Sequence, residues 1–374
     1  MAQQRDVIIF GGNGYTGKLI AESLAQRQIP FYFAGRNQDK LEKGLQIVRE
    51  RLGENAWKLD AQIVAVDNSV AALTPVFQQC KIVINVVGPF MQVAWPVVEA
   101  ALNAGCHYMD TTGEQDWTLA IAEKFGQAFA GKGLLLAPAT SYMWAAGALA
   151  AEVVLEDPEI DSLDILYQID NGLPSEASTK SFLRMVCNDS TQYYIEQNEF
   201  KSWPNDKAYE VFVPYRAAKT LALPWGGACE PVWLKGRVRN CKVLTAMGEH
   251  LIDGVMQAIQ AFNAQSAGLD QAGREALTNA IGDQINTGEP PKDHPDVQRS
   301  VIVVSGQGRV KTTTYAMNLS APYMFTGEIQ AECARLILDG QLKRAGFQSA
   351  ATGFDHRQLI RTFNALGYCS ALPN

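Results

Sequence analysis

Short apolar runs alternate with segments of helical period through the first part of the chain. Apolar runs without internal alternation are typical of strands buried on both faces of a parallel sheet, and helical segments between them supply the crossover connections. We predict strands over 7–11, 31–34, 62–66, 82–86, 107–110 and 133–137, and helices over 15–27, 38–51, 69–78, 92–104 and 117–131. The pattern predicts a doubly wound, Rossmann-type α/β domain over residues 1–140.

The pattern changes after about residue 150. Residues 163–169 alternate between apolar and polar positions, which is typical of a strand with one exposed face. We predict further strands over 210–214, 231–238 and 241–245, a hairpin over 300–317, a helix over 179–200, two helices over 247–284, and a turn-rich loop over 286–295. This predicts a second, mixed α/β domain with antiparallel strands over 141–320. We expect residues 321–374, with helices over 329–338 and 355–366, to pack back on the Rossmann domain.

Glycines follow the first apolar run at once, in the spacing Gly12-x-Gly14-x-x-Gly17. Glycine lets the backbone turn tightly and approach phosphates closely, and the helix that follows offers unpaired N–H groups at its start. We predict that the segment binds a dinucleotide pyrophosphate through Gly11, Gly12, Asn13, Gly14, Tyr15 and Thr16. The alternative is a plain glycine-rich turn between a strand and a helix.

The end of the second apolar run indicates which dinucleotide binds. An NAD site places an acidic residue on the ribose about 20 residues after the glycines. This chain instead has Gly35, Arg36 and Asn37 there, with Lys40 close behind. Arg36 can form a charge-assisted fork to a 2′-phosphate, so we predict NADP(H) as the cofactor. The alternative is that Arg36 is an ordinary solvated charge.

Two further loops follow strands of the predicted parallel sheet. Because ligands bind beyond the carboxyl ends of such strands, we expect both loops to meet the cofactor. Asp67 and Asn68 follow the third strand and are predicted to lie near the adenine. The fourth strand is followed by Val87, Gly88, Pro89 and Phe90, which we predict to lie near the nicotinamide ribose. A plain turn is the alternative for this last loop.

The fifth predicted strand ends in a loop rich in polar groups. Tyr108, Asp110 and Glu114 bring a phenol and two carboxylates into seven residues. Carboxylates and phenols can orient a substrate or transfer a proton, so these three are the candidate catalytic residues. The alternative is that Asp110 and nearby Thr112 cap the following helix.

The composition indicates which kinds of partner and which cellular compartment to expect. The chain has 374 residues, 47% hydrophobic residues and a net charge of −7, without a basic stripe, which argues against a nucleic-acid partner. Seven cysteines without a C-x-x-C pair, and four histidines, predict free thiols and no metal site. Glu152 breaks the longest apolar stretch, and no signal peptide precedes the first strand, so we expect a cytoplasmic protein without an integral membrane segment.

Four segments together resemble the saccharopine dehydrogenase-like oxidoreductases, in particular the branch of trans-acting enoyl reductases. These segments are 11–17, 34–41, 85–90 and 105–114, with a weaker match in 323–354. The resemblance is specific over residues 1–140 and at the C-terminus, and thin over about 155–300. Two departures are Ala94, where relatives often have glycine, and the segment 138–143. This segment borders the expected nicotinamide pocket, so the choice of substrate does not carry over from these relatives.

The resemblance implies an NADP(H)-binding Rossmann domain, an inserted substrate or dimerisation domain, and a homodimer through that second domain. It further implies hydride transfer to or from a C=N or C=C bond of a small organic substrate, for which the nicotinamide supplies the chemistry. A different hypothesis is a scaffold or regulatory protein that binds NADP(H) without catalysis. A third, peripheral association with a lipid surface, finds little support because no basic amphipathic helix is visible.

Overall fold

The computed structural model describes residues 5–188, 191–213, 219–284 and 288–372. Its internal contacts divide the chain into two units. The first unit comprises Met1–Thr112, Ala120–Ala145 and Tyr323–Asp355, and the second comprises Gly113–Leu119, Ala146–Pro322 and His356–Asn374. The chain passes between the units in helices α6 (Gln115–Gly131), α7 (Tyr142–Val154) and α12 (Pro322–Leu338). Residues 189–190, 214 and 286–287, which belong to predicted elements, lie outside the described residues.

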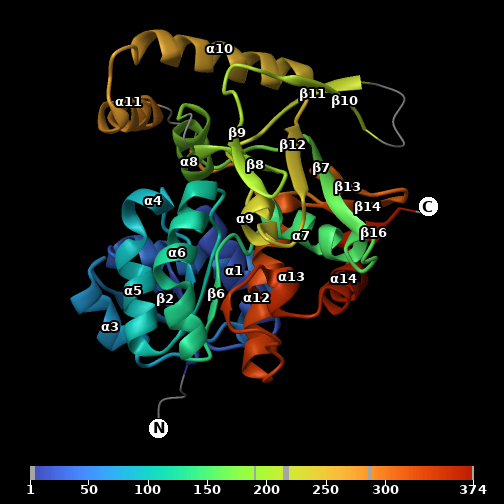
Figure 1. Ribbon diagram of the computed structural model, residues 1–374. Coiled ribbons are helices and arrows are strands. Elements are labelled where there is room, and N and C mark those ends of the chain that lie inside the picture. The colour runs from blue at the N-terminus through green and yellow to red at the C-terminus, as the bar shows by residue number, and fades with distance from the viewer. Residues whose placement is uncertain (1–4, 189–190, 214–218, 285–287, 373–374) are drawn as a thin grey trace. The chain divides into compact units, whose positions relative to one another are not determined.

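A seven-stranded sheet forms the centre of the first unit (Figure 1). Its strand order is β15-β6-β5-β4-β1-β2-β3, and all neighbouring strands run parallel. The strands are β1 (Val7–Phe10), β2 (Phe31–Gly35), β3 (Ala61–Ala65), β4 (Ile82–Asn85), β5 (His107–Asp110), β6 (Leu135–Ala137) and β15 (Gly346–Phe347). The strand order reverses between β1 and β4, and such a switch point is where open α/β sheets bind ligands.

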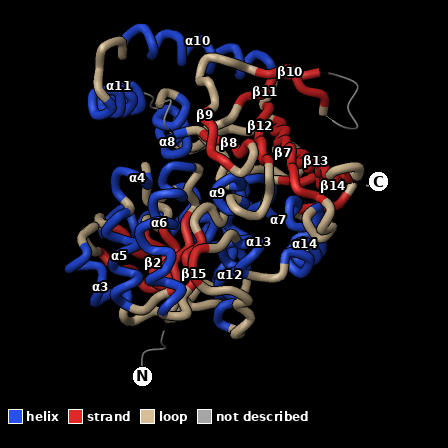
Figure 2. Tube along the Cα trace, in the orientation of Figure 1, coloured by secondary structure: helices blue, strands red, loops and turns tan. Residues whose placement is uncertain are grey.

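Helices lie between and after these strands along the chain (Figure 2), and most of them contact the sheet. They are α1 (Tyr15–Gln26), α2 (Gln38–Leu52), α3 (Val70–Phe77), α4 (Phe90–Val93), α5 (Trp95–Ala104) and α13 (Ala350–Gly353), with a 3-10 turn, η1 (Gly53–Lys58). All four residues of β1 are at most 1% exposed. Burial on both faces explains why this strand is an unbroken apolar run.

The second unit contains a nine-stranded mixed sheet. Its main path is β10-β11-β12-β7-β13-β14-β16, and β8 pairs with β12 and with β9. The strands are β7 (Ile160–Asp170), β8 (Tyr193–Glu196), β9 (Glu199–Ser202), β10 (Tyr209–Phe212), β11 (Lys219–Leu223), β12 (Asn240–Ala246), β13 (Arg299–Gly308), β14 (Thr312–Ser320) and β16 (Cys369–Ala371). β7 runs parallel to β12 and antiparallel to β13, so the prediction of a mixed sheet is confirmed.

The helices of the second unit are α8 (Glu176–Val186), α9 (Glu230–Leu234), α10 (Glu249–Gln265), α11 (Gln271–Gln284) and α14 (His356–Ala365). The predicted helix over 179–200 is wrong beyond α8. Its second half forms the β8–β9 hairpin, in which Gln197 and Asn198 have φ of 51° and 57°. Two consecutive left-handed residues make the tight turn that suits a two-residue hairpin, and this overrides the helical pattern.

The predicted strand over 231–238 is also wrong, because α9 occupies its first half. Pro231 lies in the first turn of α9, where the missing N–H of proline costs no hydrogen bond. All five residues of α9 are buried, which explains an apolar run without helical periodicity.

The C-terminal segment differs from the expectation for residues 321–374. Tyr323–Asp355 belongs to the first unit and adds β15 beside β6. His356–Asn374 belongs instead to the second unit, because β16 pairs antiparallel with β14. The final strand was not predicted, since three residues carry too little pattern to be distinguished from a loop.

Candidate functional site

The glycine-rich segment forms a tight turn at the carboxyl end of β1. The N–H groups of Gly11 and Gly12 both donate to the carbonyl of Ala34 on β2, at 2.8 and 3.0 Å, and the N–H of Gly14 donates to the carbonyl of Gly11 at 3.0 Å. The turn is therefore fastened to the neighbouring strand as well as to itself.

Steric limits explain why these positions are glycine. Gly11 has φ of +92°, a conformation that strains other residues. A Cβ at Gly17 would lie 2.5 Å from the carbonyl oxygen of Gly12, and a Cβ at Gly12 would lie 2.6 Å from the Phe33 ring. The backbone of the turn is thus packed too closely for any side chain at either position.

Helix α1 begins at the end of this turn. Its N-cap residue, Gly14, provides no side-chain cap for the first N–H groups of the helix. Asn13 and Thr16 are partly exposed, whereas Tyr15 is 5% exposed and packs edge-on against the ring of Tyr323 at 5.0 Å. Because uncapped N–H groups at a helix start attract anions, this geometry suits a phosphate group.

Arg36 and Lys40 lie directly after β2, and both side chains are exposed. A Cβ at Gly35 would lie 3.3 Å from Oδ1 of Asn13, so the end of β2 adjoins the glycine turn. Asn37 has a local role that the sequence analysis did not assign, because its Oδ1 accepts from the N–H of Lys40 at 2.9 Å and caps α2. Arg36 and Lys40 therefore lie beside the glycine turn, on either side of Asn37, the residue that caps α2.

The loop after β4 approaches the glycine turn from the other side. A Cβ at Gly11 would lie 2.6 Å from Cγ2 of Val87, while Gly88 and Pro89 lead into α4 at Phe90. After β3, Asp67 is exposed, and Asn68 donates to the carbonyl of Val93 at 2.8 Å.

The structure therefore brings the predicted cofactor residues to one edge of the parallel sheet. The backbone of the turn Gly11–Gly17, called the glycine cradle below, leaves space that side chains at its glycines would fill. This space and the cations Arg36 and Lys40 beside it fit a dinucleotide.

Two of the three candidate catalytic residues, Tyr108 and Asp110, are fully buried in the first unit. The Tyr108 hydroxyl donates to Oδ2 of Asp110 at 3.0 Å and accepts from Nδ2 of Asn85 at 3.1 Å. Oδ1 of Asp110 accepts from the N–H groups of Thr112 at 3.0 Å and Ala139 at 2.8 Å. Burial raises the pKa of Tyr108 well above its ordinary value, and the neighbouring Asp110 carboxylate adds to the shift.

This network ties the ends of β4, β5 and β6 together. Gln330 on α12 completes it, since Nε2 of Gln330 donates to the carbonyls of Asp110 at 2.9 Å and Thr140 at 2.7 Å. The sequence analysis did not single out Gln330, which lies more than 200 residues from Asp110. Only folding brings the two together, so no local pattern points to the pair.

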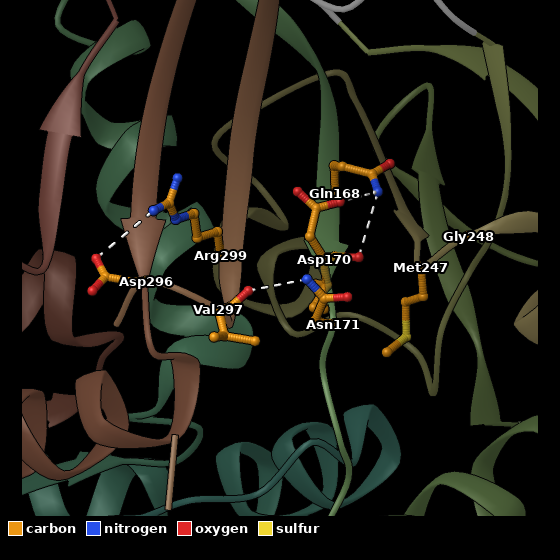
Figure 3. A pocket seen from close by; sticks show the side chains of 9 residues that line it. Gln168, Asp170, Asn171, Met247, Gly248, Asp296, Val297 and Arg299 are labelled. Carbon is orange, nitrogen blue, oxygen red and sulfur yellow. Dashed lines mark hydrogen bonds and ion pairs between the residues drawn. The ribbon is translucent and has the colours of Figure 1, made fainter. Parts of the chain in front are cut away.

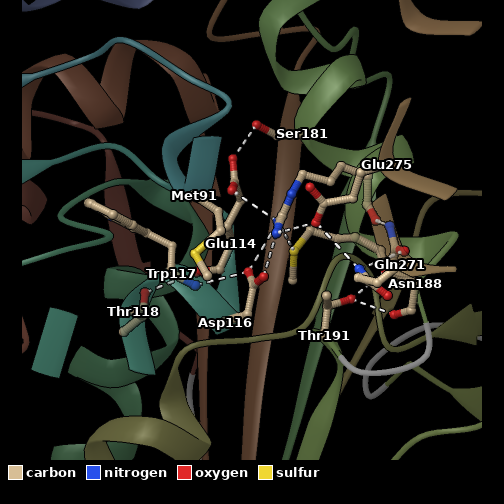
Figure 4. Close-up of polar contacts among 12 residues, drawn as sticks. Met91, Glu114, Asp116, Trp117, Thr118, Ser181, Asn188, Thr191, Gln271 and Glu275 are labelled. Carbon is tan, nitrogen blue, oxygen red and sulfur yellow. Dashed lines mark hydrogen bonds and ion pairs between the residues drawn. The ribbon is translucent and has the colours of Figure 1, made fainter. Parts of the chain in front are cut away.

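The third candidate, Glu114, belongs to the second unit. Figure 4 shows its polar contacts. Its Oε2 lies 3.2 Å from Nη1 of Arg184, and its Oε1 accepts from the Ser181 hydroxyl at 2.8 Å. Nη2 of Arg184 also lies 2.6 Å from Asp116 and 3.3 Å from Glu275. Glu114 is 0% exposed and Arg184 is 1% exposed, so this is an interior ion-pair cluster.

Electrostatics favour the charged form of Arg184. Burial opposes the charge on Arg184, but the hydrogen bond to Asp116 and the attraction of Asp116 and Glu114 outweigh it and raise the pKa of the guanidinium. The sequence analysis did not predict Arg184, because nothing nearby in the sequence distinguishes it from a surface arginine of a helix.

A second buried acid lies elsewhere in this unit. Glu230 is 0% exposed, and its Oε1 accepts from the Tyr167 hydroxyl at 2.6 Å. Burial raises the pKa of Glu230 to about 8, although the hydrogen bond from Tyr167 opposes the shift. The same hydroxyl accepts from the N–H of Gly147 at 2.8 Å, where a Cβ would lie 2.1 Å from it.

Within the described ranges, no group of three or more His, Cys, Asp or Glu side chains is arranged to hold a metal ion. Helices long and apolar enough to cross a membrane are likewise absent from that part of the chain.

Comparison with curated proteins finds relatives that match about a third of the chain. The mouse saccharopine dehydrogenase-like oxidoreductase is 29% identical over 139 residues, which cover 35% of this chain and 32% of that protein. The lipid droplet localized protein of Caenorhabditis elegans is 30% identical over 126 residues, 33% of this chain and 29% of that protein. The trans-acting enoyl reductase of Mycobacterium leprae (strain TN) is 34% identical over 113 residues, 29% of this chain and 25% of that protein. The chain thus matches about a third or less of each relative's length.

A solved structure extends the likeness to the whole fold. Saccharopine dehydrogenase (L-Glu forming) from Saccharomyces cerevisiae superposes with a TM-score of 0.63 at 11% identity, covering 99% of this chain and 100% of that one. At this identity the likeness shows the fold alone. The predicted combination of a Rossmann domain with a second mixed α/β domain is confirmed.

Two family models match the chain. Residues 7–130 match the saccharopine dehydrogenase NADP binding domain, so the predicted resemblance to these oxidoreductases is confirmed. Residues 145–372 match a model described as a family of unknown function, DUF5938. Because this second match spans more than half of the chain, the protein belongs to the DUF5938 family and carries a saccharopine dehydrogenase-type NADP-binding domain at its N-terminal end.

Proposed function

We propose that the protein is an NADP(H)-dependent oxidoreductase that transfers hydride to or from a C=N or C=C bond of a small organic substrate. The observation that carries the proposal is the exposed Arg36 beside the glycine cradle, at a strand end without a carboxylate. The domain match over residues 7–130 and the names of the relatives support the same class of activity.

The residues of the first unit have distinct tasks in this proposal. The turn Gly11–Thr16 and the start of α1 hold the pyrophosphate, and Arg36 with Lys40 holds the 2′-phosphate. Asp67 and Asn68 flank the adenine, and the loop Val87–Phe90 flanks the nicotinamide ribose. When bound, the nicotinamide supplies or accepts the hydride, and the protein places it and excludes water.

Tyr108, Asp110 and Glu114 remain the proposed catalytic-site residues, with a task refined by their contacts. Each is buried and bonded to other protein groups, which suits holding the loop after β5 in place. A direct contact of any of them with a substrate stays a prediction.

The same burial favours a second candidate, an NADP(H)-binding scaffold or regulatory protein without catalysis. Within the described residues, the side chains of all three candidates form hydrogen bonds or ion pairs with protein groups and are buried rather than exposed to a ligand. A scaffold needs the glycine cradle and Arg36, but it needs no proton donor.

Single-turnover measurements with bound NADPH separate the two candidates. We would mix the NADPH complex with cyclic imines and with enoyl thioesters and follow the loss of the reduced-nicotinamide absorbance. Oxidation that depends on one compound class supports the oxidoreductase and identifies the bond. Tight NADPH binding without oxidation by any compound supports the scaffold, and absence of NADPH binding contradicts both.

The partners and location follow as proposals from the same account. We propose a small-molecule substrate, no nucleic-acid partner, a homodimer and a cytoplasmic location. Analytical ultracentrifugation tests the dimer. Cell fractionation tests the location, and recovery with lipid droplets would contradict it and agree with the name of the nematode relative.

A further inference from the structure

The segment Gly113–Leu119 leaves the sheet of the first unit but belongs to the second. It directly follows the end of β5, and the chain returns to the first unit at Ala120. Glu114 and Gln115 are 0% exposed, and Asp116 is only partly exposed. Consecutive polar side chains lose their hydration when they are buried, so each requires a partner inside the unit.

Arg184 provides the partner for both carboxylates. It lies near the end of α8, with Nη1 3.2 Å from Glu114 and 3.2 Å from Oδ1 of Asp116, and Nη2 2.6 Å from Oδ2 of Asp116. The planar guanidinium therefore joins two carboxylates of the segment at fixed angles, which a lysine could not do. Figure 4 shows Glu114, Asp116 and Glu275 converging on this one cation.

Gln115 fixes the backbone between the two acids. Its Oε1 accepts from the N–H of Tyr193 at 2.5 Å, its Nε2 donates to the carbonyl of Tyr193 at 2.9 Å, and Nε2 also donates to the carbonyl of Ala228. The side chain thus pairs with the start of β8 as a peptide group would. It limits rotation of the segment, while Arg184 limits its displacement.

The other end of the loop is fixed within the first unit. Asp110 is held by the N–H groups of Thr112 and Ala139, as described above. Only three residues separate Asp110 from Glu114. The link between the two anchored segments is therefore short.

We infer that Arg184 is a positioning residue for the segment Gly113–Leu119, which continues the loop after β5: it fixes this segment within the second unit through Glu114 and Asp116. The inference rests on the proposed function for its consequence, because the loop after β5 lies on the nicotinamide side of the switch point. Loss of Arg184 releases one anchor of the loop without touching the pyrophosphate turn or Arg36.

Hydrogen exchange tests the anchoring in the absence of nucleotide. In Arg184→Met, the amides of Gly113–Leu119 are expected to exchange about tenfold faster or more, while those of β1 keep their wild-type rates. Arg274→Met is the matched control, since Arg274 donates to the carbonyl of Cys187 and packs over Phe262 in the same unit. Wild-type exchange of Gly113–Leu119 in Arg184→Met would overturn the inference.

Two ligands test the consequence for the cofactor. NADPH carries the nicotinamide, and 2′-phospho-ADP-ribose lacks it. Arg184→Met should weaken the binding of NADPH by about tenfold and leave the binding of 2′-phospho-ADP-ribose nearly unchanged, because only the loop after β5 is displaced. Equal weakening of both ligands would show general damage and contradict the role. If the wild-type protein binds neither ligand, the proposed function fails, and the exchange measurement alone decides on Arg184.

A triple variant covers the case in which Arg184→Met does not fold. Breaking a buried ion pair leaves unpaired charges that destabilise the protein. Arg184→Met combined with E114Q and D116N removes the two less exposed negative charges of the cluster and leaves that of Glu275, whose side chain is 27% exposed. The inference predicts rapid exchange of Gly113–Leu119 in this variant as well. Exchange and NADPH affinity at wild-type levels would show that Arg184 only neutralises the acids, and would overturn its positioning role.

Discussion

The two units differ in how their functional features arise from the sequence. In the first unit, the glycine turn depends on where the backbone can go: Gly11, Gly12 and Gly17 occupy places where any side chain would collide or strain the chain. In the second unit, it depends on side chains that meet only after folding, such as Glu114 and Arg184, which lie 70 positions apart. Steric requirements are local and therefore visible in a motif, whereas ion-pair partners are not.

Gly17→Ala should produce the largest effect on the first unit. The added Cβ would lie 2.5 Å from the carbonyl oxygen of Gly12, so the turn must move. We expect NADPH affinity, measured by fluorescence titration, to fall by roughly 100-fold, because displacement of a binding group by about an ångström has costs of this order.

Gly131→Ala is the control, because a Cβ there meets nothing within 4 Å. Similar affinities for the two variants would show that close packing of the turn does not govern binding. The comparison between the units would then lose its basis.

Glu230→Gln, in the second unit, should change how the unfolding free energy of the protein depends on pH. The pKa of Glu230 is raised from 4.5 to about 8, so the folded state keeps a proton that the unfolded chain releases. The stability that protonated Glu230 adds to the folded state is complete below about pH 4.5 and is lost as pH rises toward 8. Over this range the unfolding free energy falls by up to ~1.4 kcal/mol per pH unit.

Urea unfolding of wild type and Glu230→Gln at several pH values measures this effect. The stability of the variant relative to wild type should increase by ~3 kcal/mol between about pH 5 and pH 7.5. Glu159→Gln, at an exposed position, is the control. A difference that stays constant with pH would mean that Glu230 titrates alike in the folded and unfolded chains.

Asp110→Asn distinguishes positioning from proton transfer at the end of β5. Two N–H groups donate to Oδ1 of Asp110, and an amide accepts them less strongly than a carboxylate. We expect unfolding free energy to fall by ~2 kcal/mol. NADPH affinity should fall less than in Arg184→Met, because the oxygen of an asparagine still accepts from both N–H groups. A variant with wild-type stability that loses turnover completely would instead assign Asp110 to the chemistry.

Asn37→Ala should have the smallest effect. Loss of the cap on α2 is expected to cost ~1 kcal/mol of unfolding free energy, and Asn37→Ser should restore most of it. If Asn37 acts only as a cap, the serine variant binds NADPH as wild type does. Weaker NADPH binding by a stable Asn37→Ser would show that the side chain also contacts the cofactor.

The sequence was sufficient to predict six of the seven strands of the parallel sheet, most of its helices and the residues that lie at its carboxyl edge, because buried strands and glycine turns have local patterns. It was insufficient at the β8–β9 hairpin, where Gln197 and Asn198 adopt left-handed conformations that neither residue requires. The partners of Asp110 and Glu114, namely Gln330 and Arg184, come from distant helices, and a single sequence gives no sign of such pairs.

The central claim, that Arg36 beside the glycine cradle selects NADP(H), is tested most directly by titrating wild type and Arg36→Glu with NADPH and NADH. A charge-assisted fork to the 2′-phosphate exists only with NADPH. The account predicts that wild type prefers NADPH and that Arg36→Glu loses affinity for NADPH much more than for NADH. Equal losses for both nucleotides, or no preference in wild type, would contradict it.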